Sequence, residues 1–86
     1  MKRIMKEIEV IAVFDEEGGI TPLKFRLKNP DGDQIIKIDK IVYRNMERFA
    51  GNNMMLFDCL SADDNRQIQL QLKYELKSCR WFLYKM

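Results

Sequence analysis

The chain has 86 residues, with 15 Lys or Arg, 13 Asp or Glu and no His, and its formal net charge is +2 at pH 7. This length predicts one small domain over residues 1–86 that needs nearly all of its apolar side chains for a core. The absence of His removes the usual general base, the commonest metal ligand and every Ser-His or Cys-His nucleophile pair. An enzyme that uses carboxylates is a further alternative and would require a concave site with a raised Asp or Glu pKa, but no spacing in the sequence demands one. We therefore expect a protein that is not an enzyme and that carries no cofactor or metal.

The termini and cysteines bear on the compartment. No apolar run is long enough to span a bilayer, and Glu7 and Glu9 interrupt the basic N-terminus before a signal-peptide core can form. Cys59 and Cys79 lack the CxxC spacing of redox and zinc sites, so we expect two reduced, largely buried thiols. These features predict a cytoplasmic protein that does not bind membranes.

The first third of the chain has the two-residue period of β-strands. Residues 7–14 form an apolar strand, and an acidic loop ending in two glycines follows it. Residues 23–28 then alternate strictly between apolar and basic. This pattern places Leu23, Phe25 and Leu27 in the core and the three basic residues on the outer face.

The middle of the chain contains the strongest turn signal. Pro, Asp and Gly at residues 30–32 predict a reversal, and a longer apolar run covers residues 34–43. The apolar positions of this run change parity near Asp39 and Lys40, which indicates a β-bulge that bends the strand. Residues 44–53 are interpreted as a loop, because Gly and Asn end any helical turn there.

The last third of the chain again alternates. Residues 54–60 form an apolar strand, and a polar turn is expected over residues 61–65. Residues 67–76 alternate as a half-buried strand does. The final strand covers residues 79–86, with Trp81 on its core face.

About six strands joined by short turns, without a convincing helix, predict an all-β fold: a small antiparallel meander, rolled or closed into a barrel. An open sheet of this size exposes its edges. Pairing of two chains is the other way to cover them, so a homodimer is expected.

A basic strand face is the main candidate for binding. Lys24, Arg26 and Lys28 share one face, and Lys37 and Lys40 lie on the strand expected beside it, about 4.8 Å away. Side chains so placed can track phosphates, and a nearby aromatic ring can stack on bases. The candidate residues for nucleic-acid or partner binding are Lys24, Arg26, Lys28, Lys37, Lys40, Arg44, Arg48 and Tyr84.

Three interpretations of this surface stay open. The first is a non-enzymatic binding or interaction module that self-associates. The alternative is weak, sequence-tolerant binding of single-stranded nucleic acid through the basic face. The third is a solvated face whose lysines prevent sheet-to-sheet aggregation, with Asp33, Asp39 and Glu75 neutralising part of its charge.

Several of these elements resemble a small, uncharacterised family of bacterial domains of unknown function. Its members share a Pro-x-x-Phe segment, alternating strands and a terminal Trp-x-Leu-Tyr block. The matching residues here are Pro22 with Phe25, Ile36-Lys37-Ile38 with Ile41, residues 70–76 and residues 81–84. The resemblance covers most of the chain from Pro22 onward and implies a soluble cytoplasmic protein. Because some members look to be encoded beside DNA-repair polymerase genes, it also implies a nucleic-acid or repair-related partner.

Overall fold

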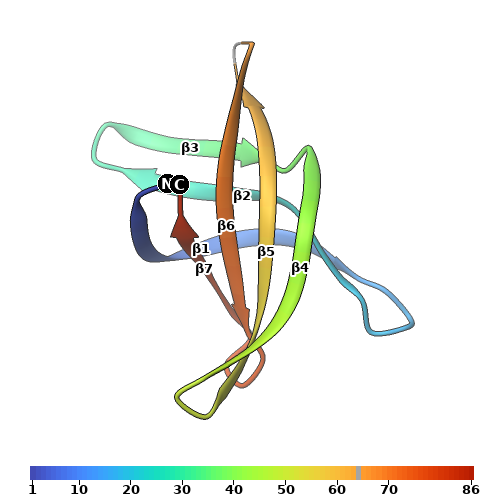
Figure 1. Cartoon of the computed structure of the whole chain (residues 1–86). Helices are drawn as coiled ribbons and strands as arrows, with labels where there is room; N and C mark the ends of the chain where they lie inside the picture. The colour runs from blue at the N-terminus through green and yellow to red at the C-terminus, as the bar shows by residue number, and fades with distance from the viewer. Residues whose placement is uncertain (64) are drawn as a thin grey trace.

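The computed structural model describes residues 1–63 and 65–86, and the side chains of all of these except Phe49 and Asp63. The described residues form antiparallel strands and no helix (Figure 1), so the all-β prediction is confirmed. The strands number seven rather than six: β1 (Arg3–Phe14), β2 (Ile20–Asn29), β3 (Gly32–Lys37), β4 (Lys40–Phe49), β5 (Asn52–Asp63), β6 (Arg66–Glu75) and β7 (Arg80–Lys85).

The strands form one sheet in the order β3-β2-β1-β7-β6-β5-β4. The first and last strands of the chain, β1 and β7, therefore pair near the middle of the sheet. Two backbone hydrogen bonds of 3.0 Å between Lys2 and Met86 hold the termini together. The sheet is strongly bent, and β1–β3 run behind and across β4–β6 in Figure 1. It is not closed: β3 and β4 remain its two edges, so the predicted barrel closure is not observed.

The extra strand arises from a corner within residues 34–43, which the sequence predicted as a single bulged strand. The Ile38 N–H donates to the Leu23 carbonyl of β2 (2.8 Å), whereas the Asp39 N–H donates to the Leu60 carbonyl of β5 (2.9 Å). Successive residues thus bond to opposite halves of the sheet. The parity change therefore marks the junction of β3 and β4 rather than a bulge at Asp39 and Lys40.

The expected loop over residues 44–53 is also wrong, because it contains the rest of β4 and the start of β5. Ala50 and Gly51 have φ angles of 50° and 84°, which suit the tight two-residue turn of a β-hairpin. Similarly, Ser61 and Ala62 continue β5 instead of starting the predicted turn over residues 61–65. Asp64 of that turn lies outside the described residues.

The core lies between the two crossing halves of the sheet. Phe25, Phe57 and Leu83 are fully buried, and each such side chain contributes about 1.5–3 kcal/mol relative to exposure. The Trp81 ring lies 5.6 Å from the Phe57 ring and 4.8 Å from the Tyr74 ring, measured between centroids. The prediction of Trp81 as a core residue is therefore confirmed.

Leu23 is the core prediction that fails. Ile11 pairs with Lys24 and Ala12 pairs with Pro22, so Leu23 is an extra residue in β2. This bulge leaves Leu23 44% exposed and gives its inward position to the buried Pro22.

The two cysteines also differ from each other. Both thiols are free, and Cys59 is buried as predicted. Cys79 is exposed, because it lies in the turn between β6 and β7 with a φ of 59°.

Candidate interaction surface

The outer face of β1, β2 and β3, called here the β1–β3 face, is the side opposite the buried Phe25 and Ile36. Its register sets out two rows of side chains across the strands. One row runs from Ile11 through Lys24 to Lys37, and the next runs from Glu9 through Arg26 to Ile35. The predicted neighbourhood of Lys24 and Lys37 is therefore observed, with the two residues directly opposite each other.

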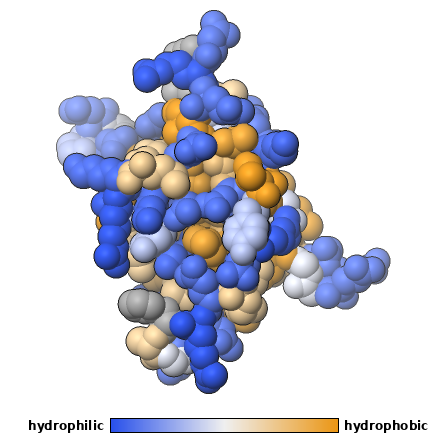
Figure 2. Space-filling view, viewed as in Figure 1, coloured by the Kyte–Doolittle hydropathy of each residue, from blue (hydrophilic) through white to orange (hydrophobic). Residues whose placement is uncertain are grey.

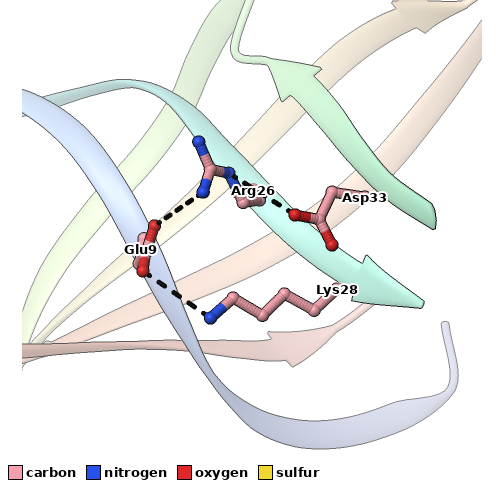
Figure 3. A network of polar contacts seen from close by, with 4 residues as sticks. All are labelled: Glu9, Arg26, Lys28 and Asp33. Carbon is pink, nitrogen blue, oxygen red and sulfur yellow. Dashed lines mark ion pairs between the residues drawn. The ribbon is translucent and has the colours of Figure 1, made fainter. Parts of the chain in front are cut away.

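A network of ion pairs neutralises part of this face (Figure 3). Glu9 lies between two cations, 3.4 Å from the Arg26 guanidinium and 3.7 Å from the Lys28 ammonium. Arg26 also lies 4.0 Å from Asp33, the acidic neighbour expected from the sequence. All four side chains are about half exposed or more, so each pair contributes only about 0–1 kcal/mol. The ion pairs therefore leave the β2 cations less net positive charge for binding phosphates than the sequence indicated.

Lys24 and Lys37 differ from the other cations of the β1–β3 face. Within the described part of the chain, no carboxylate forms an ion pair with either ammonium. Beside them, Ile11 is 56% exposed and Ile35 is 52% exposed. Both isoleucines line a shallow hollow of about 260 Å³ together with Lys24 and the ion-paired Arg26 and Glu9. This part of the face combines two lysines that form no ion pair with a described carboxylate and exposed aliphatic surface.

The basic residues of β4 lie elsewhere. β4 is the opposite edge strand of the sheet, so Lys40, Arg44 and Arg48 do not continue the β1–β3 face. Arg44 instead donates a hydrogen bond from Nη1 to the Ile20 carbonyl (3.0 Å). Its guanidinium also lies 5.6 Å from the centroid of the Phe57 ring. Arg44 therefore ties the β4 edge to the start of β2, which is a structural role.

Tyr84 lies on β7 within a second basic cluster that the sequence did not reveal. The Lys73 ammonium is 3.7 Å from the centre of the Tyr84 ring, the Lys85 ammonium 5.2 Å and the Arg3 guanidinium carbon 5.6 Å. Glu47 forms an ion pair with Lys73 at 3.2 Å. We call Arg3, Lys73, Tyr84 and Lys85 the Tyr84 cluster.

The Tyr84 cluster adjoins the outer face of β4–β6. Figure 2 shows that hydrophilic side chains dominate this face and that its hydrophobic surface is broken into patches. Lys73 lies opposite Leu56 of β5 and Phe82 of β7 in the sheet register. These apolar neighbours explain why a lysine on an outer face is nevertheless buried.

A larger hollow of about 480 Å³ lies beside the β1–β7 junction. Its carboxylates are engaged with cations: Glu7 pairs with Arg80 at 3.4 Å, and Glu9 belongs to the network of Figure 3. The charged residues lining it are Lys6, Glu7, Glu9, Arg26, Lys28 and Arg80. Its two acids therefore face cations rather than forming the carboxylate pair of an acid–base site.

The buried thiol is chemically quiet. Burial, assisted by the charge of Asp58, raises the pKa of Cys59 to about 12, so the nucleophilic thiolate is scarce at neutral pH. The pKa of Tyr74 is raised chiefly by a hydrogen bond to Cys79 and to a lesser extent by burial.

The described residues contain no group of three or more Cys, Asp or Glu side chains suited to a metal ion. They also include no helix long and apolar enough to cross a membrane.

Comparison of the chain with protein-family models, with curated proteins and with solved structures finds no match. The family resemblance noted from the sequence stays a prediction.

Proposed function

We propose that the protein is a non-enzymatic binding module whose β1–β3 face docks a protein segment carrying acidic and apolar side chains. The observation that carries this proposal is the position of Lys24 directly opposite Lys37, with Ile11 and Ile35 exposed on either side. Directly opposite side chains have Cβ atoms about 4.5–5.5 Å apart, so like charges there repel each other. A carboxylate bound between the two ammonium groups relieves this repulsion.

The isoleucines supply the non-electrostatic part of the binding. Full burial of such a side chain contributes about 1.5–3 kcal/mol, and these two have about half of their surface left to cover, so we expect about 1 kcal/mol from each. Steering by the two lysines adds salt-sensitive association. Affinity at this face is therefore expected to depend on both kinds of side chain.

Fluorescence anisotropy with labelled peptides tests the proposal. The probes are a peptide of alternating Glu and Ile, one in which Ser replaces Ile, and one in which Lys replaces Glu. We expect the first to bind most tightly, Lys24→Glu to abolish its binding and Ile11→Ser to weaken it about fivefold. Lys77→Glu, which makes the same charge change in the exposed β6–β7 turn, serves as the control. Equal binding of all three peptides, or equal loss with Lys77→Glu, refutes the proposal.

A second candidate function is sequence-tolerant binding of single-stranded nucleic acid. It is favoured by the Tyr84 cluster, which gathers three cations around one aromatic ring, rather than by the partly neutralised β2 cations. Arg3 and Lys85 are suited to phosphates, since Lys73 is already paired with Glu47.

A labelled oligothymidine distinguishes this candidate from the first. If the Tyr84 cluster binds it, the logarithm of the affinity falls by about 0.7 per phosphate contact for each tenfold rise in salt. Arg3→Ala and Lys85→Ala would then weaken binding, and Lys24→Ala would not. Absence of any salt-sensitive anisotropy change removes the candidate.

A further inference from the structure

Alternate residues of the edge strand β3 have backbone groups that form no hydrogen bond with the described part of the chain. Asn29 and Gly32 flank the two-residue turn between β2 and β3 and form a hydrogen-bonded pair of the hairpin. By the alternation of an antiparallel ladder, Gly32, Gln34 and Ile36 therefore direct their N–H and C=O groups toward β2. The bond from the Ile38 N–H to β2 follows the same parity. Asp33, Ile35 and Lys37 therefore direct their backbone groups away from β2.

We propose that two copies of the chain pair antiparallel through the β3 edges, on a twofold axis at Ile35. In this register Ile35 faces Ile35 of the second copy, and Asp33 of each copy faces Lys37 of the other. All three residues direct their backbone groups toward the partner, so the hydrogen-bond parity of an antiparallel ladder is satisfied. Their side chains lie on the β1–β3 face, where the pairing adds two opposite-charge contacts and one aliphatic contact.

The sequence of β3 favours this register over its neighbours. Shifting the axis by one residue keeps the backbone parity but places Ile35 opposite Asp33 or Lys37, which loses both Asp33–Lys37 pairs. The shift to Gln34 brings Lys37 level with Asp31, but Asp31 lies in the turn outside β3. The partner's Asp33 also supplies Lys37 with the carboxylate that the described part of its own chain does not. Charge complementarity thus identifies a second copy as the occupant of this edge.

The other edge strand has the opposite character. The same antiparallel pairing of β4 about Met46 would place Arg44 opposite Arg48, which is repulsive. β4 also has an extra residue at Val42, because Ile41 pairs with Cys59 while Tyr43 pairs with Asp58. Bulges and edge cations are the devices that prevent edge-to-edge pairing. In this proposal β3 pairs with a second β3, whereas β4 is protected from pairing. Association therefore stops at a closed dimer and does not continue into an open filament.

The interface is small, since β3 has only six residues. Self-association is therefore expected to be reversible and concentration-dependent. Ile11 and Lys24 stay exposed in such a dimer because they lie on β1 and β2, away from the edge. The partner's Asp33 and an acidic peptide would compete for Lys37. The inference does not rest on the proposed function, and its measurements contain no peptide or nucleic acid.

Charge reversal at the edge tests the pairing by sedimentation equilibrium over a wide concentration range. Asp33→Lys and Lys37→Asp should each weaken dimerisation by about tenfold or more, because each variant turns two attractive pairs into repulsive ones. The double variant Asp33→Lys with Lys37→Asp should recover it. Asp31→Lys, which makes the same charge change in the turn, should leave it unchanged. A wild-type monomer at every concentration, or a double variant no better than the singles, overturns the inference.

A covalent trap provides a second measurement that does not depend on charge. In a Cys79→Ser background, Ile35→Cys places two thiols on the twofold axis, where paired strands hold their Cα atoms about 5.5 Å apart, within disulfide range. Mild oxidation should give a disulfide-linked dimer of folded protein. Leu23→Cys, at another exposed site on β2, is the matched control. Equal crosslinking of the two variants would contradict the proposed axis.

Discussion

The ion pair between Lys73 and Glu47 should make the stability of the protein depend on the two partners very unequally. The Lys73 side chain is only 9% exposed, whereas that of Glu47 is 34% exposed. In Glu47→Gln the buried ammonium loses its ion pair with this carboxylate. Loss of one partner costs about 3–5 kcal/mol for a fully buried pair and about 0–1 kcal/mol for an exposed one. Since the carboxylate end is partly solvated, we expect Glu47→Gln to lose about 1–2 kcal/mol.

Lys73→Met is expected to be much milder, although it removes the same ion pair. It loses the contact between the ammonium and the Tyr84 ring, worth about 1–2 kcal/mol at a desolvated site. It also removes the desolvation cost of the buried charge, and the Met sulfur can pack on the ring with about 0.3–1.5 kcal/mol. The net change should therefore lie within about 1 kcal/mol of the wild type.

Urea unfolding of the wild type, both single variants and the double variant measures these differences as a thermodynamic cycle. In the Lys73→Met background no buried cation needs Glu47, so Glu47→Gln should then cost less than about 0.5 kcal/mol. The total stability of a domain of this length is about 4–13 kcal/mol, so these differences are readily measured. Equal costs of Glu47→Gln in both backgrounds would refute the reasoning.

Two other predictions concern buried groups. Iodoacetamide at pH 8 should alkylate only Cys79 in the native protein and both thiols in urea; native labelling of Cys59 would contradict its raised pKa. The pKa of Cys59 rises on folding from 9.0 to about 12, so its contribution to stability is complete below pH 9.0 and is lost as the pH rises toward about 12. This loss, seen as a falling urea midpoint, should be smaller in Cys59→Ala. In urea unfolding, Phe25→Ala should lower the free energy of unfolding by about 3–5 kcal/mol and Leu23→Thr by less than about 1 kcal/mol. Similar losses for the two substitutions would contradict the bulge in β2.

Local alternation identified much of the fold because burial on one side of a strand leaves a two-residue period in the sequence. Phe25, Leu70, Leu72 and Trp81 follow from that period and are all buried. Leu23 could not be placed in this way, since it is the extra residue of a bulge in β2 and is left exposed, although the sequence alternation is unchanged.

The candidate site depended more heavily on pairings between distant strands. Lys24 and Lys37 meet because a short turn joins their strands, and the turn signal was readable in the sequence. The neutralising position of Glu9 depends on the register of β1 against β2, which the bulge at Leu23 shifts. The Tyr84 cluster forms because β7 pairs with both β1 and β6, and no local pattern encodes that strand order.

The proposed binding at the β1–β3 face is tested most directly by two-dimensional amide NMR during titration with the alternating Glu-Ile peptide. Chemical-shift changes that saturate and map to Ile11, Lys24, Ile35 and Lys37, with the Tyr84 cluster unchanged, are the predicted result. Changes concentrated around Tyr84, or no change at any peptide concentration, would contradict the assignment of this face as the binding surface.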